Sequence, residues 1–387
     1  MKKIGYFMGA ALLTLGSCTN EINEEGFVDK ANTISFNAYS NKTRAVTGDV
    51  TSENIKGDNF GVFGYYNNSP YLYVLENTTK KAVKQKWNST SSNWEYVNPS
   101  ELKFWPDGSM DFYAYFPSSE NVTFEESNAN SNVMTISNVD CSHDVLFAYQ
   151  GSQEKTVRVP LTFNHAFSKI KGLIIEMPEE GSLFKSNCQV EVQNVEFINT
   201  DTKGNVKVNN SGKASYSVNP SNVTLRETLD PVVTINNTNA TKNLINNGTN
   251  AKGYLFATNS SETNYVTGTG KTMWDGTKNL LTAGTTLENL GQVCLKLTCK
   301  VWNGTVDNKY YYLGDNANYG VMYIPLTGTL ADPTNVSTFE AGKRYTYNIV
   351  FKDNVGFRDN GDPVLRPILF EVESVSDWSD VNVTIKL

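Results

Sequence analysis

Short segments in which hydrophobic and polar residues alternate recur along the whole chain. Alternation of this kind places the apolar side chains on one face of a β-strand. Asparagine, glycine, serine and proline separate the segments, and Asn303-Gly304 supplies the positive φ angles of a tight turn. Many short strands between turn residues predict an all-β protein built as sandwiches or barrels. The predicted strands are residues 33–39, 60–66, 110–116, 133–136, 145–149, 157–163, 170–177, 190–198, 232–235, 253–257, 293–301, 310–313, 321–324, 344–352, 367–372 and 381–387.

The N-terminus departs from this pattern. Lys2 and Lys3 precede an apolar stretch, residues 4–15, that is too short to cross a membrane comfortably. A basic start, a short apolar core and small residues before a cut are typical of a secretory signal peptide. The sequence Leu15-Gly16-Ser17-Cys18 resembles the lipobox of bacterial lipoproteins. This resemblance implies that residues 1–17 are removed and that Cys18 carries the lipid, a palmitate among its acyl chains; a plain secreted protein is the alternative.

The length of the remaining chain predicts two domains. Without residues 1–17 the chain of 387 residues keeps 370, which is long for a single hydrophobic core. The turn-forming sequence Pro178-Glu179-Glu180-Gly181 is the most plausible boundary, with an error of about fifteen residues.

The charge distribution argues against a nucleic-acid partner. The net charge is −7, and no run of lysine and arginine forms a basic patch. Charged residues make up only 19% of the chain, whereas aromatic and β-branched residues, which favour strands, are abundant. The composition therefore supports the β-rich fold and does not indicate a particular ligand.

Cysteine spacing predicts which thiols are buried. Cys294 and Cys299 lie in one predicted strand, and an odd separation of five residues puts them on opposite faces. They cannot bond to each other without breaking the strand. Cys299 is expected to point inward and to be unreactive, and Cys294 to point outward and to be labelled first. The disulfide state of Cys141, Cys188, Cys294 and Cys299 stays open.

Catalytic motifs are missing from the sequence. There is no nucleophile elbow, no zinc-protease helix and no phosphate-binding loop. His143 could form a triad with Asp140 or Asp144, but close neighbours in sequence seldom do so. His165 is interpreted as a hydrogen-bonded histidine at the end of a strand. A metal site at Cys141 and His143 lacks the further ligands that zinc requires.

Aromatic clusters could bind sugars, although aromatic side chains in strands more often belong to the core. The candidates are Tyr310, Tyr311 and Tyr312 in one strand, and Trp87 with Trp94. A glycoside hydrolase would need two carboxylates close in space, which a sequence alone does not reveal.

Several segments together resemble the fimbrillin family of the Bacteroidales, the subunits of type V pili and their relatives. They occur in the expected order, although residues from about 180 to 340 match poorly and Phe167 stands where the family often has leucine. The segments are residues 60–66 (FGVFGYY), 104–107 (FWPD), 110–117 (MDFYAYFP), 144–148 (DVLFA), 159–170 (VPLTFNHAFSKI) and 342–349 (GKRYTYNI), with Trp378 near the end.

The resemblance implies two transthyretin-like β-sandwich domains, no catalytic activity and no cofactor. With the lipobox, it divides the chain into a signal peptide at 1–17, a tether with a removable strand at 18–44, and sandwiches at 45–178 and 179–387. It also places the protein on the cell outer membrane and in a fimbrium, with other pilus subunits as partners.

Processing in this family removes a strand. In stalk subunits a surface protease cuts after an arginine, and the groove left by the first strand accepts a strand of the next subunit. Arg44-Ala45 occupies the corresponding place, and the segment removed would include Ile34, Phe36 and Ala38, which share one face. The alternative is that Arg44 is an ordinary loop residue in a permanently anchored protein.

The C-terminus offers a candidate donor strand. Val381, Val383, Ile385 and Leu387 share one face and alternate with polar residues. This strand either closes its own C-terminal sandwich or fills the groove of a neighbouring subunit.

Three hypotheses of function follow. The first is a structural and adhesive pilus subunit, assembled by strand addition after cleavage at Arg44 and held to the outer membrane through Cys18. The second is a permanently lipid-anchored surface protein that binds a host or microbial glycan or protein. The third is a hydrolase whose site the sequence does not reveal.

Overall fold

The computed structural model describes the protein as almost entirely β. Within the described residues the only helices are short 3-10 turns, and none is long and apolar enough to cross a membrane. The described residues are 32–40, 50–177, 188–201, 203–218, 223–236, 241–246, 254–256, 271–275, 286–305, 307–327, 338–351, 356, 358, 371–373 and 380–386.

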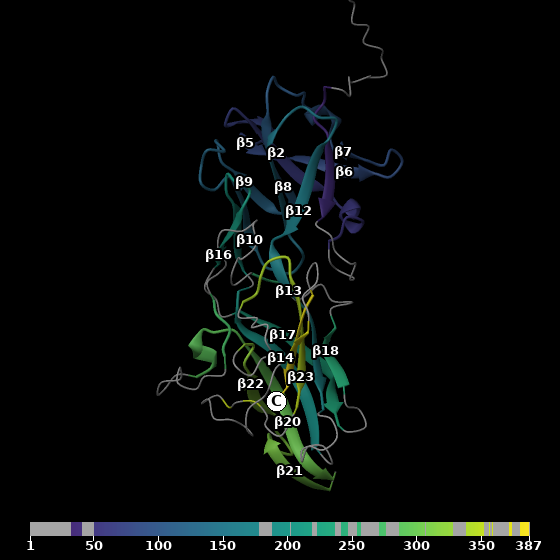
Figure 1. The fold of residues 1–387 in the computed structure, drawn as a ribbon, viewed down its shortest axis with the longest axis vertical. Helices are drawn as coiled ribbons and strands as arrows, with labels where there is room; N and C mark the ends of the chain where they lie inside the picture. The colour runs from purple at the N-terminus through teal and green to yellow at the C-terminus, as the bar shows by residue number, and fades with distance from the viewer. Residues whose placement is uncertain are drawn as a thin grey trace, which may run out of the picture.

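Two sheets form one end of an elongated molecule (Figure 1). The larger has the strand order β1-β12-β11-β8-β2-β6-β7, with β3 paired to β2, and the smaller has the order β16-β15-β10-β9. These strands are β1 (Phe36–Ser40), β2 (Phe60–Tyr66), β3 (Ser69–Leu72), β6 (Val83–Asn88), β7 (Asn93–Tyr96), β8 (Met110–Phe116), β9 (Asn121–Phe124), β10 (Met134–Val139), β11 (Leu146–Gln153), β12 (Val159–His165), β15 (Gly204–Val208) and β16 (Ala214–Val218). A separate hairpin joins β4 (Val74–Glu76) to β5 (Thr79–Lys81).

Two further sheets form the other end (Figure 1). One has the order β18-β13-β23-β25-β24 with β19 on β13, and the other has the order β17-β14-β20-β21 with β22 on β20. They are built from β13 (Phe167–Glu176), β14 (Cys188–Thr200), β17 (Val223–Ile235), β18 (Thr241–Asn246), β19 (Tyr254–Phe256), β20 (Cys294–Thr305), β21 (Asn308–Leu313), β22 (Gly320–Ile324), β23 (Arg344–Val350), β24 (Glu371–Glu373) and β25 (Asp380–Lys386). The large buried cluster between them takes side chains from both sheets, so they pack face to face.

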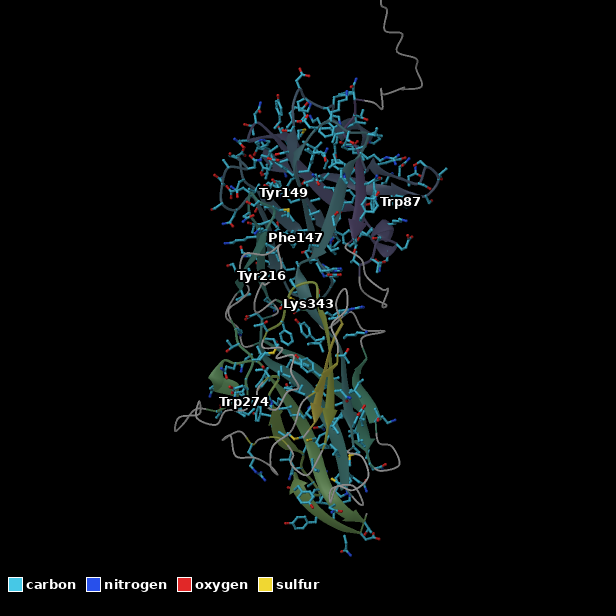
Figure 2. The ribbon with its side chains drawn as sticks, viewed as in Figure 1. Trp87, Phe147, Tyr149, Tyr216, Trp274 and Lys343 are labelled. Atoms are coloured by element: carbon cyan, nitrogen blue, oxygen red, sulfur yellow. The ribbon has the colours of Figure 1, made fainter. Side chains whose placement is uncertain are left out.

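The eight-stranded sheet is buried on both faces. On β2, Phe60 and Val62 point into a core shared with β1, while Phe63 and Tyr65 pack against the four-stranded sheet. Phe147, Tyr149 and Tyr216 mark this second contact in Figure 2. Gly61 makes room for the ring of Tyr115 on the neighbouring strand β8, because an added Cβ there would lie 2.4 Å from that ring. A strand apolar on both faces explains why residues 60–66 read as a continuous hydrophobic run.

The chain passes three times between the two ends of the molecule. β13 follows β12 after a single residue, Ala166, and joins the second pair of sheets. After β14 the chain returns to the first end, where β15 pairs with β10 and β16 pairs with β15, and it then passes back to β17. A single cut near residue 178 would therefore separate β15 and β16 from the rest of their sheet. Residues 178–187, where the sequence places the domain boundary, lie outside the described residues.

Candidate functional site

The first strand lies at one edge of the eight-stranded sheet. β1 runs parallel to β12, with Phe36 opposite Val159 and Ser40 opposite Phe163. Ile34 and Phe36 are fully buried and Ala38 is nearly so, whereas Tyr39 is 50% exposed. The predicted alternation of this segment is thus confirmed, and its apolar face forms part of the core.

Aromatic rings line the groove that β1 fills. The ring of Phe36 meets Phe112 edge to face with centroids 5.5 Å apart, and Phe60 with centroids 6.4 Å apart. Phe60 in turn contacts Trp94 and Phe163 at 4.8 Å and 5.5 Å. Edge-to-face pairs of this kind each add about 0.5–1.5 kcal/mol beyond the area that they bury. Phe36 therefore anchors β1 in the groove.

Residues 32–34, just before β1, form main-chain hydrogen bonds with residues 103–105, which are not part of β12. The Ile34 amide donates to the Lys103 carbonyl at 2.9 Å, and the Trp105 amide donates to the Asn32 carbonyl at 2.9 Å. Thr33 forms an antiparallel bridge with Phe104 in the same place. The backbone of residues 32–34 is therefore hydrogen-bonded to residues 103–105 as one strand is to its neighbour in a sheet.

The other side of this segment is bonded as well. The Val159 amide donates to the Ser35 carbonyl at 2.8 Å, and the Ser35 hydroxyl donates to the Val157 carbonyl at 2.6 Å. From within the core, the Tyr96 hydroxyl donates to the Ile34 carbonyl at 2.9 Å. Residues 103–105 on one side, and Val157, Val159 and Tyr96 on the other, thus bind residues 32–35. We call this arrangement the slot.

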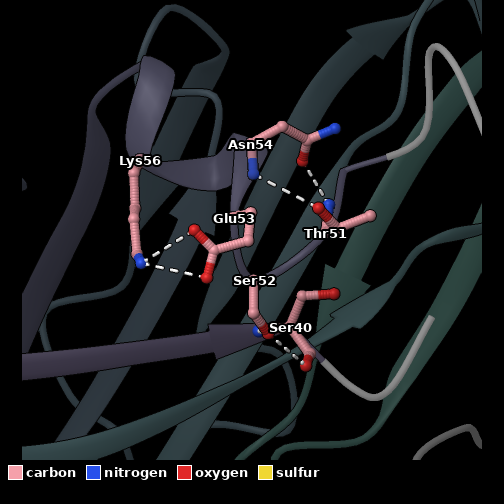
Figure 3. A network of polar contacts seen from close by, with 6 residues as sticks. All are labelled: Ser40, Thr51, Ser52, Glu53, Asn54 and Lys56. Atoms are coloured by element: carbon pink, nitrogen blue, oxygen red, sulfur yellow. Dashed lines mark hydrogen bonds and ion pairs between the residues drawn. The ribbon is translucent and has the colours of Figure 1, made fainter. Parts of the chain in front are cut away.

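Serine side chains hold the end of β1 (Figure 3). The Ser40 amide donates to Ser52 Oγ at 3.2 Å, and Ser52 Oγ donates to the Ser40 carbonyl at 3.1 Å. Ser40 Oγ donates to the Val50 carbonyl at 3.2 Å. We call these three residues the serine clasp. It joins the two ends of residues 41–49, the segment that contains Arg44 and Ala45.

A buried histidine–carboxylate pair anchors the clasp. The Val50 amide donates to Asp144 Oδ2 at 3.1 Å, and the same oxygen lies 2.8 Å from Nδ1 of His165, the last residue of β12. Both side chains are almost fully buried. The interpretation of His165 as a hydrogen-bonded histidine at a strand end is confirmed, and it ties Val50 to the sheet.

A tight turn follows the clasp. The Thr51 amide donates to Asn54 Oδ1, and the Asn54 amide donates back to Thr51 Oγ1 at 3.2 Å. Lys56 pairs with Glu53 at 3.1 Å (Figure 3). Its Nζ atom also lies over the Trp87 ring, 4.7 Å from the ring centroid. This arrangement could not be predicted from the sequence, since serine and threonine contacts depend on which segments meet in space.

The candidate catalytic histidine has another partner. His143 Nε2 lies 2.7 Å from Glu120 Oε1, and Ser142 Oγ lies 3.1 Å from His143 Nδ1. Asp144 bonds His165 instead. Among the described residues, no group of three or more His, Cys, Asp and Glu side chains is arranged to hold a metal ion.

We expect His143 to titrate above pH 6.5. Its hydrogen bond with Glu120 raises the pKa, against the opposing effect of burial. A raised folded pKa gives stability below the unfolded value of about 6.5 and loses it as pH rises through the folded pKa. NMR titration should show the raised pKa, and Glu120→Gln should lower it. An unchanged His143 pKa in that variant would contradict the ion pair.

The prediction that Cys294 is an accessible thiol is wrong. Cys299 points into the main core as predicted, and Cys294 does lie on the opposite face of β20. That face is covered by Trp274, Leu287 and Tyr323, so Cys294 is only 1% exposed. The cover arises because residues 272–274 pair with Val293, beside the start of β20. Such contacts with a distant segment cannot be predicted from the alternation of apolar and polar residues within the strand.

All four cysteines in the described residues are buried free thiols, so we expect none to react in the native protein. Burial raises the pKa of Cys188 to about 12 and raises the pKa of Cys294 and Cys299 further. A neutral, covered thiol is a poor nucleophile. Labelling with a thiol reagent should therefore require denaturant for Cys141, Cys188, Cys294 and Cys299. Rapid labelling of Cys294 in the native protein would show that Trp274 and its neighbours move away from the thiol.

The aromatic candidates differ in exposure. Trp94 is buried in the core, and Trp87 is half-buried beneath Lys56. Tyr310 is 69% exposed on β21, and its ring meets Tyr312 at a centroid distance of 5.3 Å. Among these candidates, Tyr310 therefore has the most open aromatic ring.

The C-terminal strand pairs within its own chain. β25 runs parallel to β23 and antiparallel to β24, and Val381, Val383 and Ile385 lie opposite Tyr345, Tyr347 and Ile349. Those three partners belong to the core of the lower sheets. Cys18, Arg44, Ala45 and Leu387 lie outside the described residues.

Comparison with known proteins agrees with this architecture. The family model described as fimbrillin-like matches residues 43–363. A fimbrial protein from Bacteroides vulgatus is 14% identical, with a TM-score of 0.50 over 83% of this chain and 95% of that one. A candidate cell adhesion protein from Parabacteroides distasonis is 10% identical, with a TM-score of 0.45 over 92% and 97%. No curated protein matches the chain. Because the family model spans most of the sequence, the chain belongs to the fimbrillin-like family.

Proposed function

We propose that the protein is a structural and adhesive subunit of a cell-surface pilus that assembles by β-strand addition. The observation that supports this most directly is β1. It contributes a full apolar face to the core, yet it lies at a sheet edge and directly precedes the segment with Arg44 and Ala45. Cleavage after Arg44 would cut the only covalent link between β1 and the rest of the fold.

Loss of β1 would create a binding site for another strand. The edge of β12 would present unpaired backbone groups, and the Phe60 and Phe112 rings would line an empty apolar trough. An exposed edge beside an apolar trough is a template for a strand from another chain. Other copies of this subunit, or related subunits, are the proposed partners.

The terminal strand is the proposed donor. Val381, Val383, Ile385 and Leu387 would replace the apolar face of β1 in a neighbouring subunit. Before donation this strand would have to leave its place between β23 and β24. The alternative, that it permanently closes its own sheet, agrees with the same pairing.

The remaining parts of the proposal concern anchoring and domains. We propose that Cys18 carries the lipid that holds the precursor at the outer membrane, after removal of residues 1–17. We further propose transthyretin-like sandwiches over residues 45–178 and 179–387. The two pairs of packed sheets support this division, although β15 and β16 cross it.

The Arg44→Ala variant tests the proposal. We expect the full-length protein to accumulate at the membrane without forming filaments, because β1 stays covalently in its groove. Electron microscopy and N-terminal sequencing provide the measurement, with Lys42→Ala as a matched control that keeps Arg44. Filaments of normal length from the Arg44→Ala protein would refute processing at this residue.

A permanently anchored glycan-binding protein is the second candidate. The exposed ring of Tyr310 favours it, since an open aromatic face can stack on a sugar ring. Binding of the uncut protein to a glycan array, lost in a Tyr310→Ala variant, would support this function. Absence of binding, together with filaments built from the cut protein, would support the pilus subunit.

A further inference from the structure

The two ends of β1 are held in different ways. At residues 32–35 the slot supplies main-chain bonds from both sides, from Lys103 and Trp105 on one side and from Val159 on the other. To leave the slot, this end must break both sets of bonds at about the same time. Bonds that break together present a higher barrier than bonds that break in succession.

The other end of β1 is held by the ladder with β12 and by the serine clasp. At this end of the ladder Ser40 lies opposite Phe163. The clasp bonds on this side involve the hydroxyl groups of Ser40 and Ser52 rather than a second strand. Breaking them frees one short segment at a time.

We propose that a partner strand first contacts the groove at the Ser40 end and displaces β1 from there toward Asn32. This inference rests on the proposed function, because it assumes that the groove changes its occupant. The partner pairs first beside Phe163, the residue of β12 that lies opposite Ser40, and the slot around Ile34 opens last. The serine clasp then sets how readily exchange begins.

The groove also defines the chemistry of the partner. Its inward positions are occupied by Ile34, Phe36, Ala38 and Ser40, so two bulky side chains are followed by two small ones. Ala38 and Ser40 are 6% and 5% exposed, so the packed core leaves little space for larger groups there. The groove therefore favours a strand with small side chains at these two positions, and the larger inward side chains of residues 381–387 would require the core around Ala38 and Ser40 to adjust.

Two variants test the direction of exchange, because each removes side-chain hydrogen bonds at one end only. Ser52→Ala removes two bonds to Ser40, and Tyr96→Phe removes one bond to Ile34. Ser52→Ala weakens the clasp, and Tyr96→Phe weakens the slot. A bond already broken in the transition state raises the exchange rate when it is deleted, whereas a bond still intact there does not. If displacement starts at Ser40, only the first variant should exchange faster.

The experiment uses the full chain with a specific protease site placed within residues 41–49. After cutting, a fluorescent peptide copy of residues 33–40 is added, and its uptake is followed by anisotropy. We expect Ser52→Ala, which removes two ordinary hydrogen bonds, to raise the rate about five- to thirtyfold, and Tyr96→Phe to leave it nearly unchanged. A peptide with Ala38→Leu should be taken up more slowly. A faster rate in Tyr96→Phe alone would overturn the proposal.

Hydrogen exchange in the uncut protein gives an independent measurement. The Ser40 amide should exchange faster than the Ile34 and Trp105 amides, and Ser52→Ala should widen the difference. The opposite order would overturn the proposal even if a variant or the cut protein failed to fold. Since the cut and the peptide are supplied, the result does not depend on cleavage at Arg44. Failure to form filaments would thus refute the proposed function, and the measured direction of strand exchange would still stand.

Discussion

Truncation of the chain after Asp380 is expected to lower the melting temperature of the unassembled protein by more than about 10 °C. β25 forms seven residue pairs with β23 and three with β24, and the truncation removes all of them except the pair between Arg344 and Asp380, so two strands lose a neighbour. Each lost ladder bond costs about 0.5–1.5 kcal/mol net, and the buried side chains of Tyr345 and Tyr347 on β23 would lose the strand beside them. In a domain of this size each kcal/mol lowers the melting temperature by about 2–4 °C.

Differential scanning calorimetry of the truncated and complete proteins measures this effect. A chain that lacks only Leu387 is the control, because it keeps all the pairs between β25 and β23. The result also bears on the donor strand. A truncated protein that melts normally and fails to polymerise would show that β25 contributes little to its own sheet and serves a neighbour. Normal polymerisation would rule it out as the donor.

Replacement of Phe36 by alanine should destabilise the upper sheets by about 3–5 kcal/mol, the usual cost of removing a buried phenylalanine ring. The ring is fully buried and touches both Phe60 and Phe112, so its loss leaves a cavity beneath β1. Urea unfolding followed by tryptophan fluorescence gives the measurement, since Trp94 lies in the same core.

The neighbouring residue supplies the control. Asn37 points away from the core and is half-buried, so Asn37→Ala should change the free energy of unfolding by less than about 0.5–1 kcal/mol. Equal effects of the two substitutions would mean that β1 does not occupy the groove in solution. Phe36→Leu should fall between them, because it keeps part of the buried volume.

The alternation of apolar residues was enough to predict most long strands. Residues 60–66 and 110–116 coincide with β2 and β8, because aromatic side chains pack on both faces there. The short strands β9, β15 and β16 were missed. Each has only four or five residues, and their pairing depends on contacts distant in sequence.

The candidate site was predicted only in part. The buried face of β1 follows from Ile34, Phe36 and Ala38. The serine clasp could not be predicted, because Ser40 and Ser52 meet only once the fold places their segments together. The prediction that Cys294 is accessible was wrong for a related reason, because Trp274, which covers it, comes from a separate segment of the chain.

The direct passage from β12 into β13 determines how the molecule would carry tension. Only Ala166 separates these strands, β1 runs parallel to β12, and β23 runs parallel to both β13 and β25. A pull between the occupant of the groove and the terminal strand would run along these strands rather than across them. Hydrogen bonds loaded in this shearing direction share the force, whereas bonds loaded end-on open one after another. A fibre of such subunits would therefore resist stretching along its length far better than peeling from its side.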